Sequence, residues 1–322
     1  MIRHLRAELL DDVGAVLGEG PLWDRRTGEL SWVDILSGVV HVHDRDGERR
    51  STYRVGGHVG AALPAVEGGW LLLTADGFGF LDRAGIVSSL LVVDPRPELR
   101  FNDAKCDPSG QALAGTMRYD EAAGSASLYR LEVGPIDRAE GGSTLTTRVL
   151  LRNVGLSNGL GWSSGGDTLY FIDTLTRAVV SHSYSPEGDH LGPPHEVVSI
   201  DAPLGLPDGM CVDNDGNLWV ALYGGSAVHC YRPDGQLDTV VSLPVSHPTS
   251  VTFGGPEGSR LFITTAGGGG TPQGTGAGGL WAVDPGVQGP PATPWRGSVR
   301  HFAPAAVHHG PATHSSKGTI DE

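Results

Sequence analysis

The chain has 322 residues, of which 49 are glycine and 22 are proline. This composition excludes a helical bundle or coiled coil, because those folds are rich in Ala, Glu, Lys and Leu. The net charge is −14, from 37 acidic and 23 basic side chains, and the sequence contains no basic patch. We therefore expect no nucleic-acid partner.

The chain also lacks the usual signals for secretion or membrane insertion. No run of 18 apolar residues is present, so we expect no membrane span. The first residues, MIRHLRAELLDDVG, contain no apolar core of signal-peptide length. The three cysteines, Cys106, Cys211 and Cys230, are too few for a disulfide framework. These features favour a cytoplasmic protein.

A short pattern recurs six times along the chain. A turn containing glycine is followed by four to six apolar or β-branched residues and then a small polar residue. The six copies lie at 28–35, 68–76, 110–117, 166–174, 216–223 and 258–266. Their strands begin roughly 40 to 57 residues apart, which is close to the length of a four-stranded propeller blade.

A second strand pattern follows each copy after a turn signal. These segments lie at 39–44, 78–82, 126–132, 178–185, 227–235 and 278–285. Six such pairs predict an all-β, six-bladed propeller, with blades packed around a central channel. We expect one domain over residues 1–300 and a flexible tail over 301–322. The glycine-rich segment 267–279 is interpreted as a flexible hairpin connection.

Three segments that precede the first, fourth and fifth strand pairs combine a polar residue with glycine. They contain Glu19, Asn158 and Asp208. Two carboxylates and one amide oxygen suit a divalent cation, and three protein ligands leave room for water or substrate. Asn-Gly and Asp-Gly are also ordinary turn dipeptides, so the equivalent place of all three residues is what favours a shared metal site.

Four segments together resemble the SMP-30/gluconolactonase/regucalcin-like family, over about residues 13–285. They are LGEGPLWD (17–24), RFNDAKCDPSGQALAGTM (100–117), GLSNGLGWS (155–163) and PDGMCVDNDGNLWVA (207–221). The resemblance implies a six-bladed propeller that holds one divalent metal in its channel and hydrolyses sugar lactones.

The same resemblance implies roles for individual residues. Glu19, Asn158 and Asp208 would be the metal ligands, and Arg100 and Asn102 would contact the substrate. The family has a further acidic substrate contact shortly after the GTM triplet. In this chain either Asp120 or Glu121 fits that place.

The reaction expected from these residues is hydrolysis of an aldonolactone, such as gluconolactone or a pentonolactone, to the sugar acid. The metal would polarise the carbonyl, and either Asp208 or a metal-bound water would deliver the nucleophile. Ca²⁺ and Zn²⁺ are the cations that we expect most, although Mn²⁺, Mg²⁺ and Fe²⁺ accept the same donors. Two alternatives stay open: a phosphotriesterase or other esterase, and a calcium-binding propeller without catalysis.

Other motifs are interpreted as structural. Residues 155–159 match G-x-S-x-G, but a strand rather than a helix is expected to follow, which argues against Ser157 as a nucleophile. Asp103 and Asp107 are interpreted as turn formers. The DNDG sequence at 213–216 is interpreted as a hairpin turn, because it lacks the spacing of a calcium loop.

Overall fold

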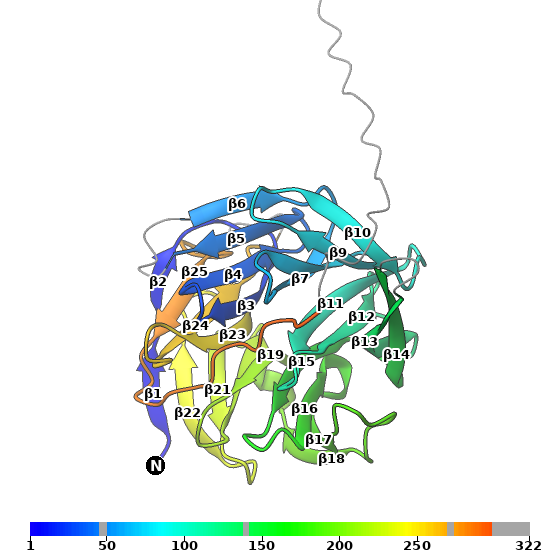
Figure 1. The fold of residues 1–322 in the computed structure, drawn as a ribbon. Helices are drawn as coiled ribbons and strands as arrows, with labels where there is room; N and C mark the ends of the chain where they lie inside the picture. The colour runs from blue at the N-terminus through cyan, green and yellow to red at the C-terminus, as the bar shows by residue number, and fades with distance from the viewer. Residues whose placement is uncertain (45–49, 138–141, 269–273, 298–322) are drawn as a thin grey trace, which may run out of the picture.

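The computed structural model describes residues 1–44, 50–137, 142–268 and 274–297. These residues form six sheets arranged radially around a central axis (Figure 1). The predicted all-β, six-bladed propeller is confirmed. The single-domain boundary at residue 300 stays a prediction. The expected tail lies outside the described residues, as does part of the glycine-rich segment 267–279.

The first strand of each blade lies nearest the axis. These innermost strands are β3 (Gly18–Asp24), β7 (Val59–Pro64), β11 (Leu99–Cys106), β15 (Ser157–Trp162), β19 (Leu206–Val212) and β23 (Pro248–Gly254). The second strands are β4 (Glu29–Asp34), β8 (Trp70–Thr74), β12 (Ala112–Arg118), β16 (Thr168–Asp173), β20 (Leu218–Tyr223) and β24 (Arg260–Thr265).

The third strands are β5 (Val39–His43), β9 (Gly77–Leu81), β13 (Ala126–Asp137), β17 (Ala178–Ser183), β21 (Ala227–Tyr231) and β25 (Leu280–Val283). The outer strands of the first five blades are β6 (Arg50–Arg54), β10 (Val87–Val92), β14 (Gly142–Val154), β18 (His195–Ser199) and β22 (Leu237–Ser242). The described residues also include two 3-10 helices, at Thr174–Thr176 and Ala202–Leu204. In the part of the chain that the structure describes, no helix is long and apolar enough to cross a membrane.

The sequence repeat therefore marks the second and third strands of each blade. The segments expected to precede the first, fourth and fifth strand pairs are themselves the innermost strands β3, β15 and β19. The repeat does not mark these innermost strands, because they carry polar side chains near the axis and the apolar pattern starts only at the next strand.

The N-terminus closes the ring. Strand β2 (Glu8–Asp11) pairs with β25 and forms the outer strand of the sixth blade. Strand β1 (Arg3–Arg6) runs parallel to β22 and adds a fifth strand to the fifth blade. The first and last parts of the propeller are thus joined by main-chain hydrogen bonds, which protects the sheet edges there.

Apolar side chains fill the spaces between neighbouring blades. Among the described residues they form six buried clusters, one for each pair of adjacent blades. Trp219 of β20 meets Phe253 of β23 edge-on at 5.7 Å between ring centroids. Trp23 of β3 stacks on Phe262 of β24 at 5.9 Å. Such aromatic pairs hold the blades, and the innermost strands on them, in fixed positions.

After β25 the chain crosses one end of the ring (Figure 1). We call residues 284–297 the strap. Its main chain bonds to the ends of several blades: Ala292 N donates to Trp23 O, and Trp295 N donates to Pro64 O. The Trp295 side chain is fully buried between the second and third blades. The strap therefore covers the end at which the innermost strands finish, and the end at which they start stays uncovered by it.

Candidate metal centre

A local irregularity occurs near the start of every innermost strand. The pairing of each one with its second strand shifts register at a corresponding place. In three strands the shift falls at the predicted ligands: between Glu19 and Leu22, between Ser157 and Leu160, and between Pro207 and Met210. Such bulges redirect side chains out of the regular alternation. Here Asn158 and Asp208 have no partner in the register, and Glu19, opposite Val33, is the last paired residue before the shift.

The glycines that follow two of these residues have a packing role. A Cβ at Gly159 would lie 2.8 Å from the main-chain oxygen of Asp208, and one at Gly209 would lie 2.1 Å from the hydroxyl of Ser250. Asn158-Gly159 and Asp208-Gly209 thus lie inside strands and are not turns. The absent side chains let neighbouring innermost strands approach closely around the axis.

Glu19, Asn158 and Asp208 are all buried, with 5%, 3% and 7% of their surfaces exposed. Burial raises the pKa of the Glu19 carboxyl well above its usual range, and the nearby Asp208 and Asp103 raise it further. The pKa of Asp208 is raised by burial and by Asp103, while Asn158 and Arg100 oppose the shift. Acidic groups from three blades therefore act on one another at the axis.

Hydrogen bonds orient the donor atoms of this cluster. Asn158 Nδ2 donates to Thr174 Oγ1 at 3.1 Å, and Thr174 Oγ1 donates to Pro207 O at 2.8 Å. This use of the amide nitrogen leaves Asn158 Oδ1 buried with no partner, and Asp208 Oδ1 is in the same state. Buried oxygens without donors cost stability unless something compensates them.

This donor set fits a divalent cation. Two carboxylates and an amide oxygen offer only oxygen ligands, and a dication would satisfy the two orphaned oxygens and offset the carboxylate repulsion. The described residues contain no cluster of three or more His, Cys, Asp and Glu arranged to hold a metal. The candidate centre does not conflict with this, because its third donor is an asparagine.

Arg100 and Asn102 lie on β11, beside the candidate ligands. Arg100 Nη1 donates to Asn102 Oδ1 at 2.6 Å, and Asn102 Nδ2 donates to Ser157 O at 2.9 Å. Both side chains are 5% exposed. Burial lowers the pKa of Arg100, while Glu19 and Asp208 act in the opposite direction. The guanidinium is thus a fixed donor at the edge of the acidic cluster.

The structure separates Asp120 from Glu121. Asp120 is held by both guanidinium arms of Arg118 at 2.7 Å, and its side chain is 58% exposed. Glu121 has a positive φ of 57°, and its charge acts on Arg100 and on Tyr223. Glu121 is therefore the acidic residue that lies on the Arg100 side, although its role stays a prediction.

Two aromatic pairs, whose tyrosines were not predicted, lie at this end. Tyr119 and His58, next to the second and third blades, share a hydrogen bond of 2.6 Å. Tyr223 and His247, next to the fifth and sixth blades, stack at 4.4 Å between ring centroids. Because blades two and three face blades five and six across a six-bladed ring, the pairs flank the axis from opposite sides. Only their positions at strand ends could have marked them in the sequence.

Asp103 was interpreted as a turn former, and this is wrong. It lies within β11, is 3% exposed, and its Oδ2 has no partner. The turn interpretation holds for Asp107, whose Oδ1 accepts from Ser109 N and Gln111 N. It holds also for the DNDG sequence, where Asp213 Oδ1 accepts from Asp215 N and Asn217 N.

Ser157 does not have the surroundings of a hydrolase nucleophile. It begins β15, and the next element is the strand β16. The residue is fully buried, and its Oγ has no hydrogen-bond partner. Its hydroxyl occupies the space left by Gly115, where a Cβ would lie 1.7 Å from Ser157 Oγ. The serine therefore serves packing between the third and fourth blades.

Comparisons with known proteins agree with this arrangement. Residues 17–267 match the model of the family described as SMP-30/Gluconolactonase/LRE-like region. This chain belongs to that family. Within it, YvrE of Bacillus subtilis (strain 168), provisionally named a sugar lactone lactonase, is 37% identical over 264 residues, covering 81% of this chain and 87% of YvrE.

Two further relatives extend the likeness to the family over most of the chain. Pentonolactonase XacC of Haloferax volcanii is 33% identical, covering 90% of this chain and 97% of XacC. The crystal structure of a calcium-binding regucalcin from Agrobacterium tumefaciens matches with a TM-score of 0.82 and 24% identity, covering 92% of this chain and 99% of that chain. The second likeness supports the fold alone.

Proposed function

We propose that this chain is a metal-dependent lactonase that hydrolyses an aldonolactone, such as gluconolactone or a pentonolactone, to its sugar acid. The observation that carries the proposal is the convergence of Glu19, Asn158 and Asp208, with two orphaned oxygens, next to the Arg100 and Asn102 pair. The family and its lactonase-named relatives support the substrate class.

Glu19, Asn158 and Asp208 would hold the cation, with Ca²⁺ or Zn²⁺ first among those that accept these donors. When bound, it supplies Lewis-acid polarisation of the lactone carbonyl. Either Asp208 or a water on the cation would deliver the nucleophile. A carboxylate oxygen of Asp208 that has no protein donor supports Asp208 as the group that would accept the proton of the attacking water. The buried surroundings strengthen each of these charge interactions.

The polar side chains next to the centre would orient the sugar. Arg100 presents a rigid fork of donors to ring hydroxyls, and Asn102 is fixed by its bonds to Arg100 and Ser157. Glu121 is the acceptor we assign to a sugar hydroxyl, because Asp120 is already bound by both arms of Arg118. We place the protein in the cytoplasm, a proposal supported by its three free, buried cysteines.

A metal add-back experiment tests the proposal. The protein is stripped with a chelator and assayed with gluconolactone, two pentonolactones and a phosphotriester, each with Ca²⁺, Zn²⁺, Mn²⁺, Mg²⁺ or Fe²⁺. We expect lactone hydrolysis to disappear on stripping and to return with at least one cation. Full activity without any cation would contradict metal dependence. Turnover of the phosphotriester but of no lactone would contradict the proposal that the substrate is a lactone.

A further inference from the structure

A second cavity lies at the other end of the innermost strands, under the strap. Its volume is about 390 Å³, and its wall includes Leu22, Lys105, Trp162, Cys211 and Thr252, together with strap residues 290–293. These side chains come from five of the innermost strands or their ends. Lys105 follows Asn102 by three residues, which is roughly 10 Å along an extended strand, so the cavity is distinct from the candidate metal centre.

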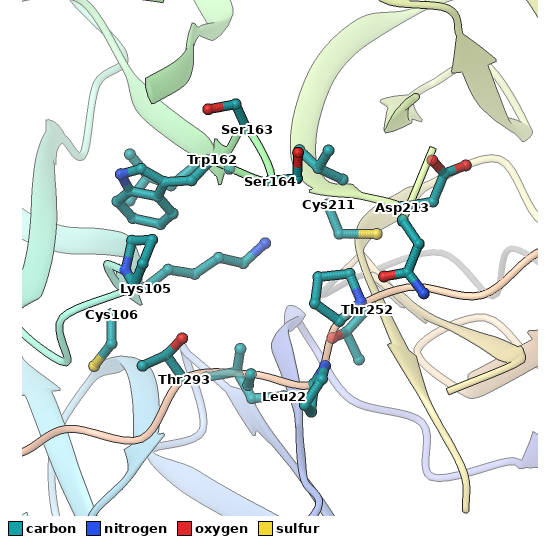
Figure 2. A pocket seen from close by; sticks show the side chains of 18 residues that line it. Leu22, Lys105, Cys106, Trp162, Ser163, Ser164, Cys211, Asp213, Thr252 and Thr293 are labelled. Carbon is teal, nitrogen blue, oxygen red and sulfur yellow. The ribbon is translucent and has the colours of Figure 1, made fainter. Parts of the chain in front are cut away.

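Lys105 is one of two charged residues that line this space, and the other is Asp213. Figure 2 shows its ammonium group pointing into the open centre of the cavity, between the walls formed by Trp162 and Cys211. The chain has only two lysines, and the other is Lys317. In a chain with a net charge of −14, a lysine beside the propeller axis is not part of a general basic surface.

The ammonium group keeps donors free for a ligand. Among the described residues its hydrogen-bond acceptor is the main-chain oxygen of Met210, and an ammonium has three N–H donors. Asp103 Oδ2 has no hydrogen-bond partner, so Lys105 does not donate to it. Asp213 also lines the cavity, but its carboxylate is taken up by Asn217 and the Trp219 indole.

The rest of the wall is mixed and firmly held, and its polar side chains are those of Ser163, Ser164, Asp213, Asn214, Thr252 and Thr293. Leu22, Trp162 and the two prolines Pro290 and Pro291 line the space. The strap is fixed over it by Ala292 N, which donates to Trp23 O at 3.2 Å, and by the buried Trp295. A preformed cavity of this size, lined by apolar side chains and some polar ones, is typical of small-molecule sites.

We propose that this cavity binds a small organic carboxylate with a flat apolar body. The carboxylate would accept from the two free N–H groups of Lys105, and the body would lie between Trp162 and the strap prolines. This occupant differs from a sugar acid, and the cavity lies at the opposite end of the innermost strands from the candidate metal centre. The site is therefore separate from substrate or product binding at the metal end.

Calorimetric titration of the full chain with 2-naphthoate tests this proposal, with neutral 2-naphthamide as the matched probe. We expect Lys105→Met to weaken 2-naphthoate binding by about tenfold or more, since a charge-assisted hydrogen bond is lost, and to change 2-naphthamide binding much less. Ser164→Trp places bulk at an exposed residue of the cavity rim, and we expect it to weaken both probes.

Arg100→Met supplies the control at the opposite end, and we expect it to leave the affinity for 2-naphthoate unchanged. Thermal unfolding verifies that each variant is folded. If Lys105→Met does not fold, the affinity of Ser164→Trp for 2-naphthoate still tests the proposal. The proposal is overturned if 2-naphthoate does not bind, if Lys105→Met and Ser164→Trp bind it as the original chain does, or if gluconate or Arg100→Met removes the binding.

Discussion

Both ends of the innermost strands carry buried acidic residues, but their surroundings differ. At the strap end Asp24, Asp107 and Asp213 are saturated: Asp213, for example, accepts from two main-chain N–H groups, from Asn217 and from Trp219. At the open end Asp208 keeps an oxygen without a donor and is buried near Glu19.

The difference separates a structural carboxylate from the one for which we propose a function. A saturated carboxylate stabilises the turn that it closes. An orphaned one next to another acid destabilises the fold unless a cation or a substrate compensates. The acidic residues are buried at both ends, so the proposed site rests on the difference in hydrogen-bond saturation and not on burial.

The largest expected effect comes from neutralising one carboxylate at each end. Asp208→Asn should lower kcat/KM for a lactone by about 10²–10³-fold, because it removes a ligand charge and the proton acceptor. The matched change at the strap end, Asp213→Asn, should leave kcat per folded molecule nearly unchanged. Steady-state kinetics at saturating cation measures both, and equal losses in the two variants would contradict the contrast.

The pH dependence of stability should differ with metal content. The pKa values of Glu19 and Asp208 are raised above 4.5 and 3.8, their ordinary values in an unfolded chain. Above about pH 4 the metal-free folded state therefore holds more protons than the unfolded state, and its free energy of unfolding falls as pH rises.

The slope should reach about 1.4 kcal/mol per pH unit for each proton retained. Denaturant unfolding in chelator across pH 4 to about 8 measures it, with excess cation as the control that removes the decline. A Glu19→Gln chain should show a shallower slope. Because His229, whose pKa burial lowers to about 4, adds a rise in stability over part of this range, the comparison between variants decides: equal slopes for Glu19→Gln and the original chain would contradict the assignment of Glu19 to the buried cluster.

The sequence predicted the repeat better than it predicted the local structure around the candidate ligands. The second and third strands are buried on both faces, so their apolar runs were visible. Asp208-Gly209 and the DNDG sequence at 213–216 both combine aspartate with glycine, and each sequence is compatible with a turn. Only the close approach of Gly209 to Ser250 and the bonds that saturate Asp213 show that one lies in a strand and the other in a turn.

Other features depend on contacts between distant segments and had no local signal. The strap carries no strand pattern, and its place over the innermost strands follows from bonds such as Trp295 N to Pro64 O. Our assignment of the sugar contact to Glu121 instead of Asp120 likewise depends on Arg118, whose guanidinium donates two hydrogen bonds to Asp120. Neighbours in sequence are equivalent candidates until a third side chain distinguishes them.

Stability should respond with opposite sign at the two ends in metal-free protein. Asp213→Asn should lower the free energy of unfolding by roughly 1.5–3 kcal/mol, because charge-assisted hydrogen bonds are lost. Asp208→Asn should raise it, since a desolvated charge is removed from the acidic cluster. Urea unfolding in chelator gives both values. Destabilisation by Asp208→Asn as large as that by Asp213→Asn would mean that its carboxylate is structurally satisfied after all.

The smallest effect distinguishes the two neighbouring acids at the open end. Glu121→Gln should lower kcat/KM about tenfold, as expected for one weakened hydrogen bond to a sugar hydroxyl, with most of the change in KM. Asp120→Asn should change it less than about twofold, because Asp120 is exposed and bound to Arg118. If Asp120→Asn has the larger effect, Arg118 must release it when substrate binds, and the open end is less preorganised than the strap end.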